Sequence, residues 1–180
     1  MKQKGPWEIQ SSVKKYENPW MSVTEDKVIR PDGEYGIFGV VTILSGVSVL
    51  AMDDEGYVYL TKEYHYGIER VGIETVSGGK NSGEAFLDTA KRELKEELGI
   101  EATKWVDLGR VDPLTTNLMA PVEIYLAQDL IFKEPNQEGT EVITMKKVKF
   151  EKAVEMVMSS EITHGPSCIL ILKAKEYLKV

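Results

Sequence analysis

The sequence predicts an α/β fold in which a mixed sheet is flanked by helices and preceded by N-terminal antiparallel strands. Two observations support this prediction. Over residues 7–60, short runs of β-branched and aromatic residues alternate with turn signals at 31–33 and 53–56, a pattern typical of antiparallel strands. After residue 83, segments with helical spacing alternate with strand-like segments, which indicates helices packed on a sheet.

The individual elements follow from local patterns. Strands are predicted over 35–44, 47–52, 57–60, 105–108, 122–130 and 142–150, and helices over 84–98, 151–159 and 166–178. The helix over 84–98 carries Leu87, Ala90, Leu94 and Leu98 on one stripe and ends before Gly99. Residues 65–83 are rich in glycine. A chain of 180 residues fits one domain with one substantial core.

Composition excludes several classes of protein. A net charge of −7 argues against broad binding to nucleic acid, and no apolar run approaches the ~20 residues that cross a bilayer. The first residues carry no secretory signal, so a cytoplasmic location is the default expectation. Cys168 lies in an apolar run and is expected in the core. An acidic chain is still compatible with a small phosphorylated substrate, because divalent metal can bridge carboxylates to phosphate.

The candidate chemistry lies on the helix over 84–98. Glu93, Glu96 and Glu97 are three and four residues apart, so they share one helix face beside the apolar stripe. Converging carboxylate oxygens are what Mg²⁺ or Mn²⁺ requires. The alternative is a solvated acidic face paired with Lys91 and Lys95, and spacing alone favours that alternative.

The surrounding residues reverse this preference. The chain reads Gly78-Gly79-Lys80-Asn81-Ser82-Gly83-Glu84, then seven further residues, then Arg92-Glu93-Leu94-Lys95-Glu96-Glu97-Leu98-Gly99-Ile100. This segment resembles the Nudix box, with every defining position filled. The resemblance implies a single Nudix hydrolase domain over 1–180, an α/β/α sandwich with its box at 78–100, and a loop-helix-loop that binds Mg²⁺ or Mn²⁺.

The resemblance also implies roles for the box residues. Glu93 and Glu97 are the firmest metal ligands, with Glu97 central to catalysis, and the backbone carbonyl of Ser77 would add a ligand. Glu96 is either a third ligand or a partner of Arg92 one turn earlier. Gly79 would let the backbone approach a substrate phosphate.

Outside the box, the chain resembles the ADP-ribose pyrophosphatase and nucleoside diphosphate sugar hydrolase branch of the family. The similar segments are Val40-Val41, residues 74–79, residues 125–127 and the C-terminal helix. This branch implies that metal-activated water cleaves a diphosphate to give a nucleoside monophosphate and a sugar phosphate. It also implies a catalytic loop acid, for which Glu141 is the first choice and Glu138 the second, unless both are plain surface acids. Hydrolysis of nucleoside triphosphates or dinucleotide polyphosphates, and a non-catalytic nucleotide-binding module, are the alternatives.

The branch further implies a homodimer in which N-terminal strands over 1–38 cross to the partner, while 39–180 form the catalytic core. Trp7, Tyr16 and Trp20 either stack on a base or sugar or belong to the dimer core.

Substrate preference is expected to depart from ADP-ribose alone. Where the branch commonly has Gln-x-Arg, this chain has Glu63-Tyr64-His65, so a permanent cation is replaced unless Arg70 supplies one. After the box, Leu114 follows Pro113 where glycine is usual. Several nucleoside diphosphate sugars are therefore expected as substrates, with His65 and Arg70 among the binding residues.

Overall fold

The computed structural model describes residues 2–136 and 142–179, and the chain forms two compact units. One unit contains Met1–Ser45 and Asp112–Pro121, and the other contains Gly46–Val111 and Val122–Val180. The sequence predicts a division after residue 38, whereas the first segment of the N-terminal unit continues to Ser45 and the unit also includes residues 112–121. That segment joins the N-terminal unit from far along the chain.

The N-terminal unit is a five-stranded sheet in the order β1-β2-β3-β4-β10. Its strands are β1 (Lys2–Lys4), β2 (Trp7–Glu17), β3 (Met21–Ile29), β4 (Tyr35–Ile43) and β10 (Leu118–Met119). Neighbouring strands are antiparallel except β10, which runs parallel to β4. The predicted antiparallel strands and the turn at 31–33 are confirmed, the turn being closed by a hydrogen bond from Gly33 N to Arg30 O at 2.9 Å.

The second unit is built on a mixed seven-stranded sheet in the order β12-β6-β5-β11-β9, with β7 paired to β6 and β8 paired to β5. Its strands are β5 (Gly46–Met52), β6 (Tyr57–His65), β7 (Arg70–Glu74), β8 (Val76–Gly79), β9 (Ile100–Val111), β11 (Val122–Phe132) and β12 (Thr144–Lys149). A short 3₁₀ turn, η1 (Tyr66–Ile68), connects β6 to β7. Only the β5–β11 pair is parallel among these described pairings, which makes the sheet mixed as predicted.

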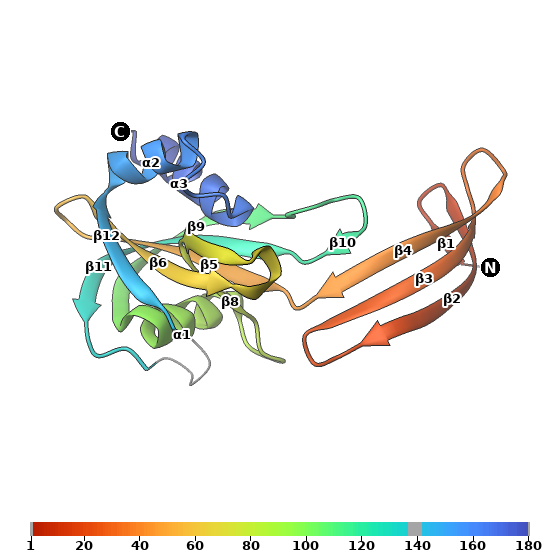
Figure 1. Ribbon diagram of the computed structural model, residues 1–180, viewed down its shortest axis with the longest axis horizontal. Helices are drawn as coiled ribbons and strands as arrows, with labels where there is room; N and C mark the ends of the chain where they lie inside the picture. The colour runs from red at the N-terminus through yellow and green to blue at the C-terminus, as the bar shows by residue number, and fades with distance from the viewer. Residues whose placement is uncertain (1, 137–141, 180) are drawn as a thin grey trace. The chain divides into compact units, whose positions relative to one another are not determined.

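Three helices cover this sheet on both faces. Helix α1 (Phe86–Leu98) lies on one face, and α2 (Phe150–Met158) and α3 (Gly165–Leu178) lie on the other (Figure 1). The alternation of side chains along the central strands explains the two layers. On β11, Ile124 and Leu126 pack in the core beneath α2 and α3, whereas Tyr125 and Ala127 pack in the core beneath α1. The predicted α/β/α sandwich is confirmed.

The boundaries of several elements differ from those predicted. Helix α1 begins at Phe86 rather than at residue 84, because the Glu84 carboxylate accepts a hydrogen bond from the backbone of Asn81 and so belongs to the preceding loop. Phe150 begins α2 instead of ending a strand. The glycine-rich segment at 65–83 contains β7 and β8, for which the sequence predicts no strands; β7 alternates over only five residues, and β8 ends in two glycines. Among the described residues, no helix has both the length and the apolar character needed to cross a membrane.

Gly99 ends helix α1 as predicted. Its φ of +64° is in the left-handed region, and its N–H donates to Lys95 O at 3.0 Å. A Cβ added at this position would lie 2.2 Å from the carbonyl oxygen of Lys133, so a larger residue would displace the chain there as well. The box helix therefore ends at a position that only glycine fits.

We expect Gly99→Ala to lower the free energy of unfolding by about 2–4 kcal/mol, since it adds left-handed strain and a backbone clash. The matched control is Gly56→Ala in the β5–β6 turn, where φ is +76° and the nearest atom is 4.0 Å away. That variant should lose only about 1 kcal/mol, from strain alone. Urea unfolding followed by circular dichroism at 222 nm measures both, and equal losses would contradict the clash at Gly99.

Candidate active site

Arg92 donates five hydrogen bonds within the box, four to acidic side chains and one to a backbone carbonyl. Its Nε and Nη2 donate to the two Glu84 carboxylate oxygens at 3.0 and 3.1 Å. Its Nη1 donates to Glu93 Oε1 at 2.8 Å and to Glu96 Oε2 at 3.0 Å. Nη2 also donates to the carbonyl of Gly79 at 3.0 Å. One guanidinium thus fixes three glutamates and the end of β8 relative to one another.

These bonds keep the pair of Arg92 and Glu84 ionised. Hydrogen bonds from Arg92, assisted by the backbone N–H of Asn81, lower the pKa of Glu84 to about 2. In return, the hydrogen bond to Glu84, the charge of Glu93 and the hydrogen bonds to Glu96 and Glu93 raise the pKa of Arg92 above its usual range. The Arg92–Glu84 ion pair is therefore already formed at neutral pH.

The three helix glutamates differ in exposure. The side chain of Glu96 is 32% exposed and that of Glu93 is 12% exposed, while Glu97 as a residue is only 6% exposed. Glu97 lies on the buried stripe of α1 together with Ala90 and Leu94, not beside it. A carboxylate at this depth is costly to keep charged unless cations or hydrogen-bond donors surround it.

Strand β8 contacts helix α1 directly at Gly78. A Cβ on Gly78 would lie 2.0 Å from the Glu93 carboxyl carbon, so the carboxylate occupies the space that any side chain would need. At Gly79 nothing lies within 4 Å of such an atom, which leaves its backbone approachable, as its expected role requires. Ser77, whose carbonyl is the expected additional ligand, pairs with Ser48 of β5 and immediately precedes this contact.

The donor set suits a hard divalent cation by its chemistry. Glu93 and Glu96 supply carboxylate oxygens, the ligand type that such cations prefer, and both accept a hydrogen bond from Arg92 Nη1, which keeps the two carboxylates close together. Within 2–136 and 142–179, no three acidic, histidine or cysteine side chains converge closely enough to hold one metal ion. A complete coordination shell would need other donors, such as a backbone carbonyl. The expected catalytic acids Glu138 and Glu141 lie outside the described residues.

His65 and Arg70 line a separate pocket beside the N-terminus of α3, which no box glutamate lines. At its centre, the Glu74 carboxylate lies between both histidines of the chain. His65 Nε2 is 3.0 Å from Glu74 Oε1, and His164 Nδ1 is 3.0 Å from Glu74 Oε2. Arg70 Nη2 donates to Thr163 Oγ1 at 3.0 Å on the pocket rim. The structure thus brings the two expected binding residues together but does not group them with Gly79.

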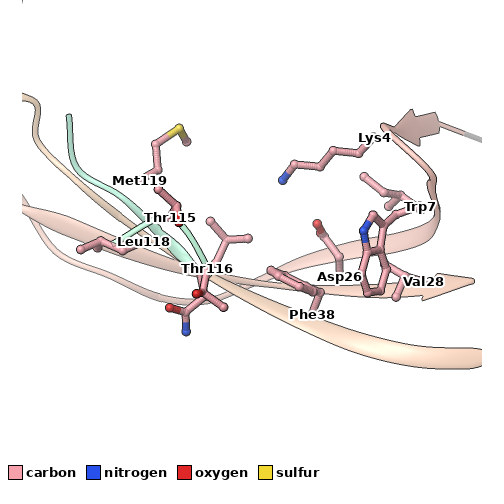
Figure 2. Close-up of a pocket in the computed structure, with 12 residues that line it drawn as sticks. Lys4, Trp7, Asp26, Val28, Phe38, Thr115, Thr116, Leu118 and Met119 are labelled. Carbon is pink, nitrogen blue, oxygen red and sulfur yellow. The ribbon is translucent and has the colours of Figure 1, made fainter. Parts of the chain in front are cut away.

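A further pocket lies within the N-terminal unit, where Trp7 packs edge-on against Phe38 with ring centroids 5.4 Å apart (Figure 2). Asp26 on its floor is 6% exposed, and its Oδ1 has no hydrogen-bond partner among the described residues. Lys4 and the segment Thr115–Met119 complete the lining. Trp7 thus contacts Phe38 and lines this pocket, whereas Tyr16 and Trp20 are 53% and 68% exposed.

Sequence reasoning missed Glu74, His164 and Asp26. No spacing rule connects His65 with His164, which are related only because each contacts the Glu74 carboxylate at the end of β7. The available signal was rarity, since the chain has only two histidines. Asp26 gave no signal at all, because its burial depends on pairing across β3 and β4.

Comparisons with known proteins agree with this geometry. Residues 7–41 match the family model of the nucleoside diphosphate sugar hydrolase N-terminal domain, and residues 42–159 match that of the NUDIX domain. The chain is 30% identical over 159 residues to an ADP-ribose pyrophosphatase of Bacillus subtilis (strain 168), covering 83% of each chain. It is 26% identical over 161 residues to a methanol dehydrogenase activator of Bacillus methanolicus, covering 86% of this chain and 85% of the relative.

The fold is also similar to that of a solved structure. A crystal structure of an ADP compounds hydrolase superposes with a TM-score of 0.84 at 18% identity, covering 96% of this chain and 94% of the other. The NUDIX model covers the sandwich up to α2, including the Arg92 cluster but not α3, and this family generally requires a divalent metal cation. By its box, its sandwich and these matches, the chain is an enzyme of the Nudix hydrolase family.

Proposed function

We propose that the enzyme hydrolyses the diphosphate linkage of a nucleoside diphosphate sugar such as ADP-ribose, giving a nucleoside monophosphate and a sugar phosphate. The observation that carries the proposal is the Arg92 cluster, in which one guanidinium orients Glu93 and Glu96 while the Glu93 carboxylate lies against Gly78. The N-terminal family model and the Bacillus subtilis relative, both named for such activities, support the substrate class.

In this proposal Glu93 and Glu97, with Glu96 and the carbonyl of Ser77, would hold Mg²⁺ or Mn²⁺. A bound divalent cation supplies charge for the phosphate oxygens and lowers the pKa of its water. Arg92 keeps the carboxylates oriented, and the open backbone at Gly79 lets phosphate approach. Glu141, or Glu138 in its place, is proposed as the base that takes a proton from the attacking water.

The pocket of His65 and Arg70 is proposed to contribute to substrate recognition. Arg70 offers a permanent cation, whereas His65 is bonded to Glu74 and is a weaker phosphate ligand than arginine. A clamp of this kind tolerates variation in the sugar, so we propose that several nucleoside diphosphate sugars are accepted.

We also propose that the enzyme is cytoplasmic and forms a homodimer through the N-terminal unit. Large apolar side chains on β2 to β4 are exposed in the single chain, among them Val13, Tyr35 and Ile37, which are 51%, 80% and 69% exposed. Exposed apolar residues concentrated on one sheet favour burial against a partner.

A substrate panel tests the proposed activity. Release of phosphate from the products by an added phosphatase should report cleavage of ADP-ribose and of at least one other nucleotide sugar, in the presence of Mg²⁺ or Mn²⁺. The Glu97→Gln protein prepared in parallel controls for contaminating hydrolases. Turnover of nucleoside triphosphates alone would overturn the proposed substrate class.

Removal of the metal or of its ligands should abolish most activity. We expect Glu93→Gln and Glu97→Gln each to lower kcat by about a hundredfold or more, the scale of losing a key electrostatic group. Excess chelator should do the same to the unaltered enzyme. Lys91→Gln on the exposed side of α1 is the control and should retain full activity, since Lys91 is 50% exposed and makes only a 3.9 Å ion pair with Asp88. Full activity of Glu97→Gln would contradict the assignment.

Replacement of the loop acids identifies the base. Glu141→Gln should lower kcat with little change in KM, because the box carboxylates are committed to metal and the proton acceptor must come from elsewhere. Glu138→Gln is the matched variant. A crippled Glu138→Gln beside a near-normal Glu141→Gln would exchange their roles.

Light scattering at micromolar concentration should give the mass of a dimer, about twice the 20.2 kDa of one chain. Tyr35→Lys with Ile37→Lys should shift the mass toward the monomer, because charges on this strand oppose its burial. A monomeric unaltered protein would exclude this assembly.

A further inference from the structure

A continuous series of hydrogen bonds connects Ser77, at the metal-binding end of β8, with His164 at the start of α3. Ser77 Oγ is 3.2 Å from Ser48 Oγ, and Ser48 Oγ is 2.5 Å from Thr75 Oγ1. Thr75 Oγ1 is 2.9 Å from Ser167 Oγ, which is 2.8 Å from His164 Nδ1. Ser48, Thr75 and Ser167 are fully buried, so solvent does not replace the two bonds that join these three hydroxyls.

The direction of every bond in this series is determined by its Ser77 end. Ser77 Oγ donates its hydrogen to Thr75 O at 3.0 Å, because a carbonyl can only accept. Ser77 must then accept from Ser48, and each hydroxyl has a single hydrogen, so Thr75 donates to Ser48 in turn. By the same step Ser167 donates to Thr75.

The series ends at His164, which must carry its proton on Nδ1 to donate to Ser167. Ser167 Oγ also accepts from the backbone N–H of Thr75 at 3.0 Å, which fits an oxygen that gives its hydrogen elsewhere. His164 Nδ1 is in addition 3.0 Å from Glu74 Oε2, so its one hydrogen is shared between two acceptors in a three-centre bond, and both acceptors require Nδ1 to be protonated. Both contacts of His164 therefore agree with one direction along the series.

These hydroxyls act on β8 from the side opposite to the glutamates. Gly78 meets the Glu93 carboxylate of α1, whereas its neighbour Ser77 is bonded toward Ser48 and, through Thr75, toward Ser167 of α3. Thr75 contributes its hydroxyl, its N–H and its carbonyl to the series. The backbone at 75–77 is thereby fixed at three points immediately before the contact with Glu93.

We propose that Ser48, Thr75 and Ser167 are positioning residues for catalysis, which hold the Ser77 carbonyl and Gly78 at the distance from α1 that metal binding requires. The inference rests on the proposed function, in which Ser77 and Glu93 are metal ligands. Groups that orient ligands without touching the metal commonly change metal affinity by tenfold to a hundredfold, and these hydroxyls stand in that relation to Ser77.

Thr75→Val tests the proposal, because valine keeps the shape of threonine and removes both hydrogen-bonding functions of its hydroxyl. We expect the Mn²⁺ concentration for half-maximal binding to rise by about tenfold or more, measured by electron paramagnetic resonance without substrate, with a parallel rise in the Mn²⁺ requirement of activity. Thr75→Ser should restore the metal affinity to within about twofold of the unaltered enzyme, since the hydroxyl returns.

Thr61→Val is the matched control. Thr61 is 3% exposed and donates to a backbone carbonyl, that of Glu74, at 3.2 Å, but it is not part of the series. It should lose a similar amount of thermal stability and keep normal Mn²⁺ affinity. If Thr75→Val lost stability like Thr61→Val and bound Mn²⁺ normally, the hydroxyls would be structural only and the proposal would be overturned. If Thr75→Val fails to fold, Ser48→Ala replaces it with the same expectation.

Two results separate this inference from the proposed function. An unaltered enzyme that bound no Mn²⁺ and kept its activity in excess chelator would overturn both, whereas normal Mn²⁺ binding by Thr75→Val would overturn only the positioning role.

Nitrogen-15 NMR of the two imidazoles, assigned with His65→Gln, gives an independent readout. His164 should be protonated on Nδ1, and a His164 protonated only on Nε2 would overturn the bond direction on which the series depends.

Discussion

The rest of the site depends on the hydrogen bonds that the Arg92 guanidinium donates to the acidic residues of the box. The box places Glu84 just before α1 and Glu93 and Glu96 on the helix itself, and the like charges of these side chains repel one another. Arg92 donates two hydrogen bonds to Glu84, one each to Glu93 and Glu96, and a fifth to the end of β8. The loop before α1, the end of β8 and α1 itself are consequently all bonded to one side chain, and the acidic residues are oriented before any ligand binds.

The sandwich provides the rigid frame for this centre. Alternation on β5 sends Val47 and Val49 toward α1 and Leu50 toward α2 and α3, so each helix layer has its own core. Ser48 interrupts this alternation with a polar group on the α3 side, and it is tolerated there because Thr75 and Ser77 satisfy it. Three buried polar residues of this unit, Ser48, Thr75 and Ser167, thus form one hydrogen-bonded group next to strand β8.

Local patterns predicted what depends on local physics. The stripe of Leu87, Ala90, Leu94 and Leu98 predicts α1, and Gly99 predicts its end, because both follow from helical geometry. The meeting of His65, Glu74 and His164 depends on how β6, β7 and α3 pack, and no property of neighbouring residues encodes it. Likewise, the box pattern identifies Glu97 as a functional candidate, but its burial among Ala90 and Leu94 becomes visible only when α1 is packed on the sheet.

The parallel pairing of β10 with β4 has a consequence for the order of synthesis. Leu118 pairs with Val41, so the fifth strand of the N-terminal sheet leaves the ribosome only after the box helix and β9 have been made. Until then the edge of β4 at Val41 and Thr42 presents unpaired backbone groups. A nascent chain that pauses before residue 118 therefore keeps this part of the edge open, even when the other four strands of the sheet have been made.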